Sequence, residues 1–208
     1  LIFLYEGEKS IITYRGANNF LDEKDVDEKE IASSNFFVFT SMTSKRNVRF
    51  IDKAIEISKK NRVKIVCNPS VAMIDHQKNK LISYIKVSDF VIMNKKEALK
   101  LTKKDNVESA IKCLKKITNG VVIVTLGRKG SVVYDDKIKN FKAYKVDVID
   151  TTGAGDVFTG SFLHAYLLTN EIDYSIKFAH ASSALKISNK GRKIPTEKEV
   201  IEFMEENS

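Results

Sequence analysis

The chain has 208 residues, of which 43% are hydrophobic and 30% charged, a balance that suits one soluble domain with a substantial core. No apolar run approaches the roughly 20 residues that a membrane-spanning helix needs, and no signal peptide is recognisable, so we expect a cytoplasmic protein without a membrane partner. The formal charge of +8 raises nucleic acid as a partner. Most of that charge is lysine interspersed with acidic residues, without an arginine cluster or a tract of interleaved aromatics, so solvated helix faces explain it better.

Two further features of the composition bear on the class of protein. Cys67 and Cys113 belong to no CxxC motif and have no histidine pair nearby, so we expect free thiols rather than a disulfide or a zinc site. The sequence begins at Leu1, without Met and inside an apolar run, as a part of a longer protein would.

The first predicted element is a β-hairpin. Residues 1–5 and 10–14 are apolar or β-branched runs, and the turn between them contains Gly7. Taken alone, the pattern fits an ordinary edge hairpin. An Arg-Gly-Ala-Asn-Asn loop at 15–19 follows it.

Strands and helices alternate through the remaining sequence. Helical spacing of apolar residues predicts helices at 48–60, 75–84, 107–117 and 172–190, and Thr196 with Glu199 forms a capping box for a last helix. Apolar runs predict strands at 36–40, 63–67, 89–93, 121–125 and 131–134, the first of them buried on both faces of a parallel sheet. The pattern predicts a single α/β domain with helices on both faces of a mainly parallel sheet.

The most informative stretch is Asp150-Thr151-Thr152-Gly153-Ala154-Gly155-Asp156. Alternating apolar and polar residues at 143–149 predict a half-buried strand before it, and a helical pattern starts at Val157. The first N–H groups of a helix lack internal partners and attract an anion, which small residues allow to approach closely. Asp156 is then placed to accept a proton from a hydroxyl that attacks a phosphate.

Other interpretations of this stretch are weaker or simpler. A dinucleotide fingerprint needs Gly or Ala where Phe158 stands, and the Gly-Lys-Ser/Thr ending of a P-loop is absent. A plain helix start, with glycines for the turn and Asp in the first turn, remains open.

A second candidate pair follows the strand predicted at 89–93. Asn94 ends that strand and Glu97 lies one turn into the next helix, so both project to the sheet edge that bears Asp156 if the strands run parallel. A helix cap with a first-turn Glu is the alternative.

From Asp150 to Gly160 the sequence resembles the second signature of the ribokinase-like sugar kinases, the PfkB carbohydrate-kinase family, with Ser161 where Gly or Ala is usual. The resemblance implies a ribokinase-like three-layer sandwich, with residues 1–19 as part of a small β lid over the sugar and 20–208 as the nucleotide-binding and catalytic core. It also implies that about the first third of a family member precedes residue 1.

The resemblance assigns roles to the candidate residues. Asp156 would be the general base, and Gly153, Ala154 and Gly155 would form the anion hole. Asn94 and Glu97 match the family's Asn-x-x-Glu motif, which orders Mg²⁺ through water. Asp150 and Thr152 would offer oxygens to a monovalent cation such as K⁺.

The same resemblance indicates the ATP site. Thr125-Leu126-Gly127 matches the family's Thr-Leu-Gly, Phe178-Ala179-His180-Ala181 a run that borders the adenine, and Asn189-Lys190-Gly191 the loop that closes it, although Arg192 replaces the usual Ala. The implied nucleotide-binding residues, besides Asn94 and Glu97, are Thr125, Gly127, Gly130, His180 and Gly191. A strand-turn-strand would use the glycines at 127 and 130 as well.

We therefore expect transfer of the ATP γ-phosphoryl group to a hydroxyl of a small sugar. Gly16-Ala17-Asn18 and the Phe-Ala-His-Ala run favour ribose, whereas Ser41-Met42-Thr43 stands where ribokinases tend to carry a Glu. Fructose, 2-keto-3-deoxygluconate or a nucleoside remain alternatives. A nucleotide-binding regulator without catalysis and a basic nucleic-acid-binding domain are alternatives of another class. The open edges of the lid would suit a homodimer.

Overall fold

The computed structural model describes residues 2–5, 8–12, 14–189 and 194–207. Within these ranges the main sheet has six strands, in the spatial order β3-β4-β5-β6-β7-β8. Strands β3 to β6 are parallel, and β7 and β8 are added antiparallel. Their bounds are Phe36–Phe39 (β3), Lys64–Cys67 (β4), Phe90–Asn94 (β5), Val121–Thr125 (β6), Ser131–Tyr134 (β7) and Ile138–Phe141 (β8).

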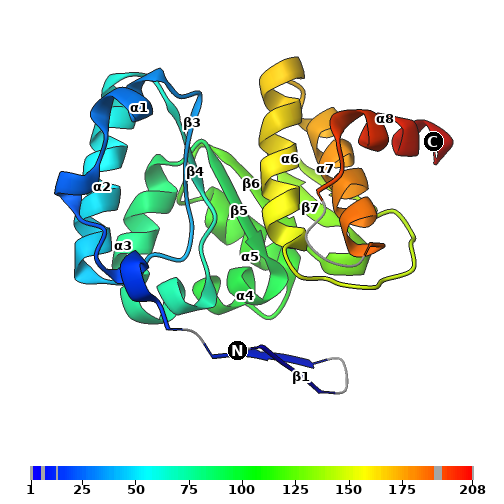
Figure 1. Cartoon of the computed structure of the whole chain (residues 1–208), viewed down its shortest axis with the longest axis horizontal. Helices are drawn as coiled ribbons and strands as arrows, with labels where there is room; N and C mark the ends of the chain where they lie inside the picture. The colour runs from blue at the N-terminus through cyan, green and yellow to red at the C-terminus, as the bar shows by residue number, and fades with distance from the viewer. Residues whose placement is uncertain (1, 6–7, 13, 190–193, 208) are drawn as a thin grey trace.

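Helices cover both faces of this sheet, so the body has the three layers that the sequence predicts (Figure 1). One face carries α2 (Lys45–Lys60), α3 (Val71–Val87), α4 (Lys95–Thr102) and α5 (Val107–Lys115). The other carries α6 (Ala154–Thr169) and α7 (Ile172–Ile187), with α8 (Glu197–Glu206) packed outside them. The short α1 (Glu28–Ser33) lies against α2.

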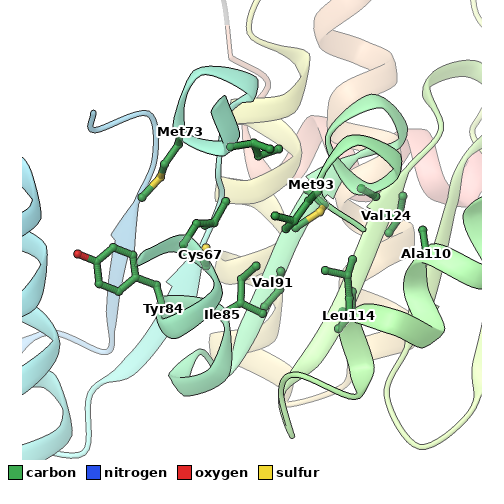
Figure 2. Close-up of a cluster of buried hydrophobic side chains, with 14 of the residues drawn as sticks. Cys67, Met73, Tyr84, Ile85, Val91, Met93, Ala110, Leu114 and Val124 are labelled. Carbon is green, nitrogen blue, oxygen red and sulfur yellow. The ribbon is translucent and has the colours of Figure 1, made fainter. Parts of the chain in front are cut away.

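Alternate side chains of each strand enter two separate cores. In β5, Val91 and Met93 face α2 to α5, whereas Phe90 and Ile92 face α6 and α7. Figure 2 shows the first core, in which Val91 and Met93 lie among side chains from the helices and from neighbouring strands. Because helices cover both faces of the sheet, the central strands consist of continuous runs of apolar residues.

Both cysteines are free thiols in the structure. Cys67 is buried in this first core, and burial raises the pKa of its thiol well above the ordinary value. A thiol held neutral in this way behaves as a small apolar side chain.

Strand β3 forms an edge of the sheet in the described part of the chain. Phe39 is only 2% exposed, but Val38 is 40% exposed, so the prediction of a strand buried on both faces is wrong for Val38. The reason is that β3 is an edge strand among the described strands, and the core beneath α6 and α7 reaches Val66 of β4 and Phe36 but not Val38.

The predicted hairpin is present as β1 (Ile2–Tyr5) and β2 (Glu8–Ile11), which form a separate antiparallel sheet. Figure 1 shows it projecting from the three-layer body. The segment that follows is fastened to the body: the buried Asn47 donates from Nδ2 to the carbonyl oxygens of Asn18 and Leu21, at 2.8 and 3.2 Å. Whether residues 1–19 act as a lid and 20–208 as a separate core stays a prediction.

Several predicted elements differ from the structure, among them the second hairpin strand, which was predicted at 10–14 and is Glu8–Ile11. Residues 142–150 are not a strand; β8 precedes them, and Val148 and Ile149 are 57% and 53% exposed. The glycine loop therefore follows an irregular segment. Helix α3 is longer than the predicted 75–84, since Ser70 caps its start by accepting a hydrogen bond from the N–H of Met73.

Among the described residues, no helix combines the length and the apolar character that crossing a bilayer would require.

Candidate active site

A cavity of about 890 Å³ opens at the carboxyl ends of β5 and β6. Its wall includes Asn94 and Thr125 from those strands, Ala154 and Gly155 from the start of α6, and His180 from α7. Asn94 and Thr125 are neighbours in the parallel register of β5 and β6. The fold thus brings Asn94, Thr125 and the start of α6 to one cavity, whereas Glu97 and Asp156 are not on its described wall.

The start of α6 leaves open space above its backbone. Gly153 is the N-cap residue with φ +78°, a conformation that glycine adopts without strain. The N–H of Ala154 donates to the carbonyl oxygen of Thr151 at 3.2 Å, while the N–H groups of Gly155 and Asp156 have no acceptor within the helix. A Cβ added at Gly153 or Gly155 would meet no atom within 4 Å, so an anion can reach this helix end.

Asp156 lies in the first turn of α6, directly after Gly155. Its side chain is exposed, and the described wall of the cavity reaches Gly155 but does not include Asp156. Asp156 is therefore exposed and lies one residue beyond the described wall of the cavity. Its role as a base stays a prediction.

Asn94 and Glu97 form a capping box at the start of α4. The Oδ1 atom of Asn94 accepts from the N–H of Glu97 at 2.9 Å, and Oε2 of Glu97 accepts from the N–H of Asn94 at 2.8 Å. Partial burial raises the pKa of Glu97, and the N–H of Asn94 opposes that shift. The helix-cap interpretation is thus correct, and the capping box fixes both side chains at the carboxyl end of β5. Their role in ordering Mg²⁺ stays a prediction.

The turn after β6 contains Gly127 and Gly130, both on the cavity wall. Gly127 has φ +59° with open space around it, whereas Gly130 has φ +95° and a Cβ there would lie 1.8 Å from the carbonyl oxygen of Phe141. Gly130 is therefore required by close backbone packing. Gly127 has open space around it, and Thr125 at the end of β6 and Arg128 in the turn also line the cavity.

His180 is 5% exposed, although it contributes to the cavity wall. Its Nε2 lies 2.8 Å from the hydroxyl of Ser131, and its ring packs edge-on against Phe158 with 5.0 Å between centroids. Burial lowers the pKa of His180 to about 4, so the ring is neutral at pH 7. An uncharged imidazole ring on an apolar wall can pack against a nucleobase, and it does not attract the phosphate groups as a charged ring would.

The sequence pattern missed the segment that closes the cavity on one side. Ala143, Tyr144, Lys145, Val146 and Val148 all line the cavity, so polar and apolar residues of the segment face it alike. The N–H groups of Ile149 and Asp150 both donate to the carbonyl oxygen of Ile187. No predicted strand was left to pair with 143–149. That was the sequence signal that this segment lines a cavity instead of joining the sheet.

The remaining predicted residues are only partly described. Asp150 accepts at Oδ1 from the N–H of Thr152, 2.8 Å away, which shapes the turn before the glycine loop. Gly191 and Arg192 lie outside the described residues. Within the described part of the chain, no group of three or more His, Cys, Asp or Glu side chains is arranged to hold a metal ion.

Comparison with known proteins identifies relatives along almost the whole chain. The family model for pfkB family carbohydrate kinases matches residues 1–199. A ribokinase of Haemophilus influenzae is 36% identical over 208 residues, covering 95% of this chain and 65% of the relative. A deoxyribokinase of Salmonella typhi is 28% identical over 190 residues, covering 88% of this chain and 60% of the relative. The chain therefore spans less than two thirds of the length of these relatives.

Solved structures agree on the fold. The ribokinase of Thermotoga maritima is 26% identical with a TM-score of 0.81, covering 98% of this chain and 68% of that one. An Escherichia coli protein described as a ribokinase II and solved with ATP and Mg²⁺ is 25% identical with a TM-score of 0.86, covering 99% of this chain and 70% of that one. The predicted ribokinase-like α/β fold is confirmed. The chain belongs to the pfkB family of carbohydrate kinases.

Proposed function

We propose that the protein transfers the γ-phosphoryl group of ATP to a hydroxyl of a small sugar, with a ribose-like acceptor favoured. The observation that carries the proposal is the convergence of the α6 helix start, Asn94 and Thr125 on one cavity of about 890 Å³. That volume falls within the range of small-molecule and cofactor sites. Family membership supplies the reaction type.

The side chain of Asp156 and the backbone of the glycine loop have different roles in this reaction. The acceptor hydroxyl oxygen bonds to the γ-phosphorus, the bond from that phosphorus to the bridging oxygen breaks, and ADP leaves. Asp156 takes the hydroxyl proton; its carboxylate is exposed and directly follows Gly155. The N–H groups of Gly155 and Asp156 donate to the oxygens on which negative charge grows.

Asn94 and Glu97 are proposed to order Mg²⁺ through its bound waters. Their oxygen atoms can accept hydrogen bonds from those waters, and Mg²⁺ gives up its hydration shell reluctantly. When bound, Mg²⁺ neutralises charge on the phosphates. Asp150 and Thr152 are proposed for a monovalent cation beside the loop, because their side chains would supply oxygen donors close in sequence to Gly153.

The adenine is proposed to occupy the part of the cavity away from the loop. Tyr144, Val146 and Val148 supply apolar wall there, and the neutral His180 adds an aromatic face. Apolar walls of this kind take up a flat base by burial and stacking. Gly191 is proposed to belong to the loop that closes this end.

The acceptor is proposed from relatives rather than from contacts. The ribokinase and deoxyribokinase among them favour a pentose, whereas 5-dehydro-2-deoxygluconokinase of Clostridium botulinum and a rice fructokinase keep other sugars open. The loop at Ser41 lies at the carboxyl end of β3, where the carbonyl oxygen of Ser41 accepts from Arg15 at 2.9 Å. This contact links the base of the hairpin to the sheet edge on which an acceptor would lie.

The decisive experiment is an acceptor panel with Mg-ATP on the full-length protein, wild type and Asp156→Asn. Ribose, deoxyribose, fructose, 2-keto-3-deoxygluconate and adenosine are offered, and the phosphorylated product is identified by mass spectrometry. Loss of the base should lower kcat about 100- to 10,000-fold while ATP binding stays near that of the wild type. Asp147→Asn, an exposed carboxylate of the preceding segment, is the control and should retain activity. Full activity of Asp156→Asn would remove the assignment.

The same panel separates a catalyst from a nucleotide-binding regulator. A regulator would bind ATP in calorimetry yet give no phosphorylated product with any acceptor. The small open loop and the adjacent carboxylate favour the catalyst, since binding alone does not call for a proton acceptor at that place.

We also propose that the hairpin β1–β2 joins two copies of the protein. Within the described residues it is a two-stranded sheet that pairs with no strand of the body, and such a sheet is marginally stable alone. Pairing of its edges with another copy would satisfy their backbone groups. Sedimentation equilibrium should then give a dimer that removal of residues 1–13 converts to a monomer; a wild-type monomer at all concentrations would contradict this.

A further inference from the structure

The charges on the wall of the cavity all have one sign. Arg128 and Lys145 are the charged residues among its described lining, and that lining contains no Asp or Glu. Neither cation forms an ion pair with a carboxylate of the described residues, and Arg128 is exposed. Two such cations facing one cavity create a field that attracts a polyanion.

Arg128 is held on the cavity wall, near the carboxyl ends of β5 and β6, by its place in the fold. It is the middle residue of the 3₁₀ turn Gly127–Lys129, which directly follows β6. The turn is closed by the N–H of Gly130 donating to the carbonyl oxygen of Gly127 at 2.9 Å, and it follows Thr125, the register neighbour of Asn94. Arg128 therefore starts from the same sheet edge as the proposed Mg²⁺ contact.

The next residue makes the geometry selective. Lys129 belongs to the same turn and is also exposed, but only Gly127, Arg128 and Gly130 of this turn line the cavity. One of two adjacent cations is thus on the wall and the other is directed elsewhere. This difference is the basis of a matched comparison.

The chemistry of the guanidinium fits a phosphate chain. Arginine stays charged at all accessible pH values and presents several N–H donors in a planar fork, so it can bind two phosphate oxygens at once. We propose that Arg128 binds the polyphosphate of the nucleotide and sets the preference for ATP and ADP over the free nucleoside. The inference rests on the proposed kinase function and adds to it a residue outside the glycine loop and the Asn94–Glu97 pair.

The test compares Arg128→Gln with Lys129→Gln by calorimetric titration of the full-length protein with Mg-ATP, Mg-ADP and adenosine. Arg128→Gln should weaken ATP and ADP binding by roughly 10- to 100-fold and leave adenosine binding within about twofold, because a charge-assisted hydrogen bond is lost. Lys129→Gln should leave all three affinities within about twofold. Arg128→Lys should give an intermediate loss, since the charge stays but the fork is removed.

Two further measurements separate the possible outcomes. The salt dependence of ATP binding should flatten in Arg128→Gln alone, and thermal unfolding of both variants should match the wild type, which excludes a folding defect. Equal effects of the two substitutions, or an equal loss of adenosine binding, would overturn the inference. If Arg128→Gln behaves as the wild type while Asp156→Asn is inactive, the inference fails and the proposed function stands. If the wild type binds no adenine nucleotide, both fail.

Discussion

At the scale of single residues, His180 shows how a buried polar ring can serve two purposes. Its contact with Ser131 crosses 49 residues of sequence and satisfies a ring nitrogen that would otherwise be costly to bury. Because His180 also contributes to the cavity wall, the same contact fixes that part of the wall.

The depressed pKa of His180 predicts a pH-dependent stability. Its pKa is about 4 in the folded chain against an ordinary 6.5, so between these values the unfolded chain binds more protons. Its contribution to the free energy of unfolding is fully present above about pH 6.5 and is lost as the pH falls towards 4, by up to roughly 3 kcal/mol.

Urea unfolding at pH 7, 5.5 and 4.5 measures this loss. His180→Gln should unfold at lower urea at pH 7 but show a smaller decrease with acidification than the wild type. His164→Gln is the control, because His164 is exposed and pairs with Glu197 at 3.2 Å on the surface. If the acid-induced decrease persists unchanged in His180→Gln, the titration belongs to other groups.

At the scale of elements, α6 contains two glycines with different surroundings. A Cβ would meet no atom within 4 Å at either Gly155 or Gly160, so alanine fits at both. Gly155 lines the cavity at the helix start, whereas Gly160 lies exposed in the middle of the helix. Stability and ligand binding can therefore be separated within one helix.

We expect Gly155→Ala and Gly160→Ala to keep or raise the melting temperature, since alanine favours a helix over glycine by up to about 1 kcal/mol. Only Gly155→Ala should lower the affinity for ATP and kcat, each by about tenfold or more, because its methyl group occupies the space where the phosphate approaches. Calorimetry and steady-state kinetics on both variants test this pair. Similar kinetics in the two would place the phosphate away from the helix start.

Elements also mark the limit of what the sequence could predict. The capping box of Asn94 and Glu97 and that of Thr196 and Glu199 depend on residues three apart, so a local pattern identifies them. The segment 143–149 has the alternation of a strand but lines a cavity. A local pattern does not distinguish a segment that lines a cavity from one that pairs in a sheet. The kink of α3 at Gln77, whose Nε2 donates to the carbonyl oxygen of Thr43, depends on a contact 34 residues away.

At the scale of the whole molecule, the body and the hairpin are held by different forces. Two apolar cores on either side of the sheet and a third beneath α8 stabilise the body, whereas the hairpin backbone pairs only with itself among the described strands. The fold class followed from the alternation of strands and helices, although one face of β4 and β5 is covered by α6 and α7, which lie far from them in sequence. The exposure of Val38 could not be predicted in this way, because it depends on which elements cover β3 at the edge of the sheet.

Removal of residues 1–13 should leave the melting temperature of the body within a few degrees of the wild type. Removal of α8 should lower it strongly, because Ala165, Phe178 and Ala181 would become exposed to water. Differential scanning calorimetry of the two truncated proteins makes the comparison. A large loss of stability on removing the hairpin would mean that its side chains contribute to a core of the body.

The described wall of the cavity begins at Asn94 and ends at Ile187, so the strands and helices before β5 take no part in it. The nucleotide side of the proposed reaction is thus encoded in one contiguous stretch of the gene. Under the proposed function, substitutions before Asn94 should therefore change the choice of acceptor or the assembly more than the binding of the nucleotide.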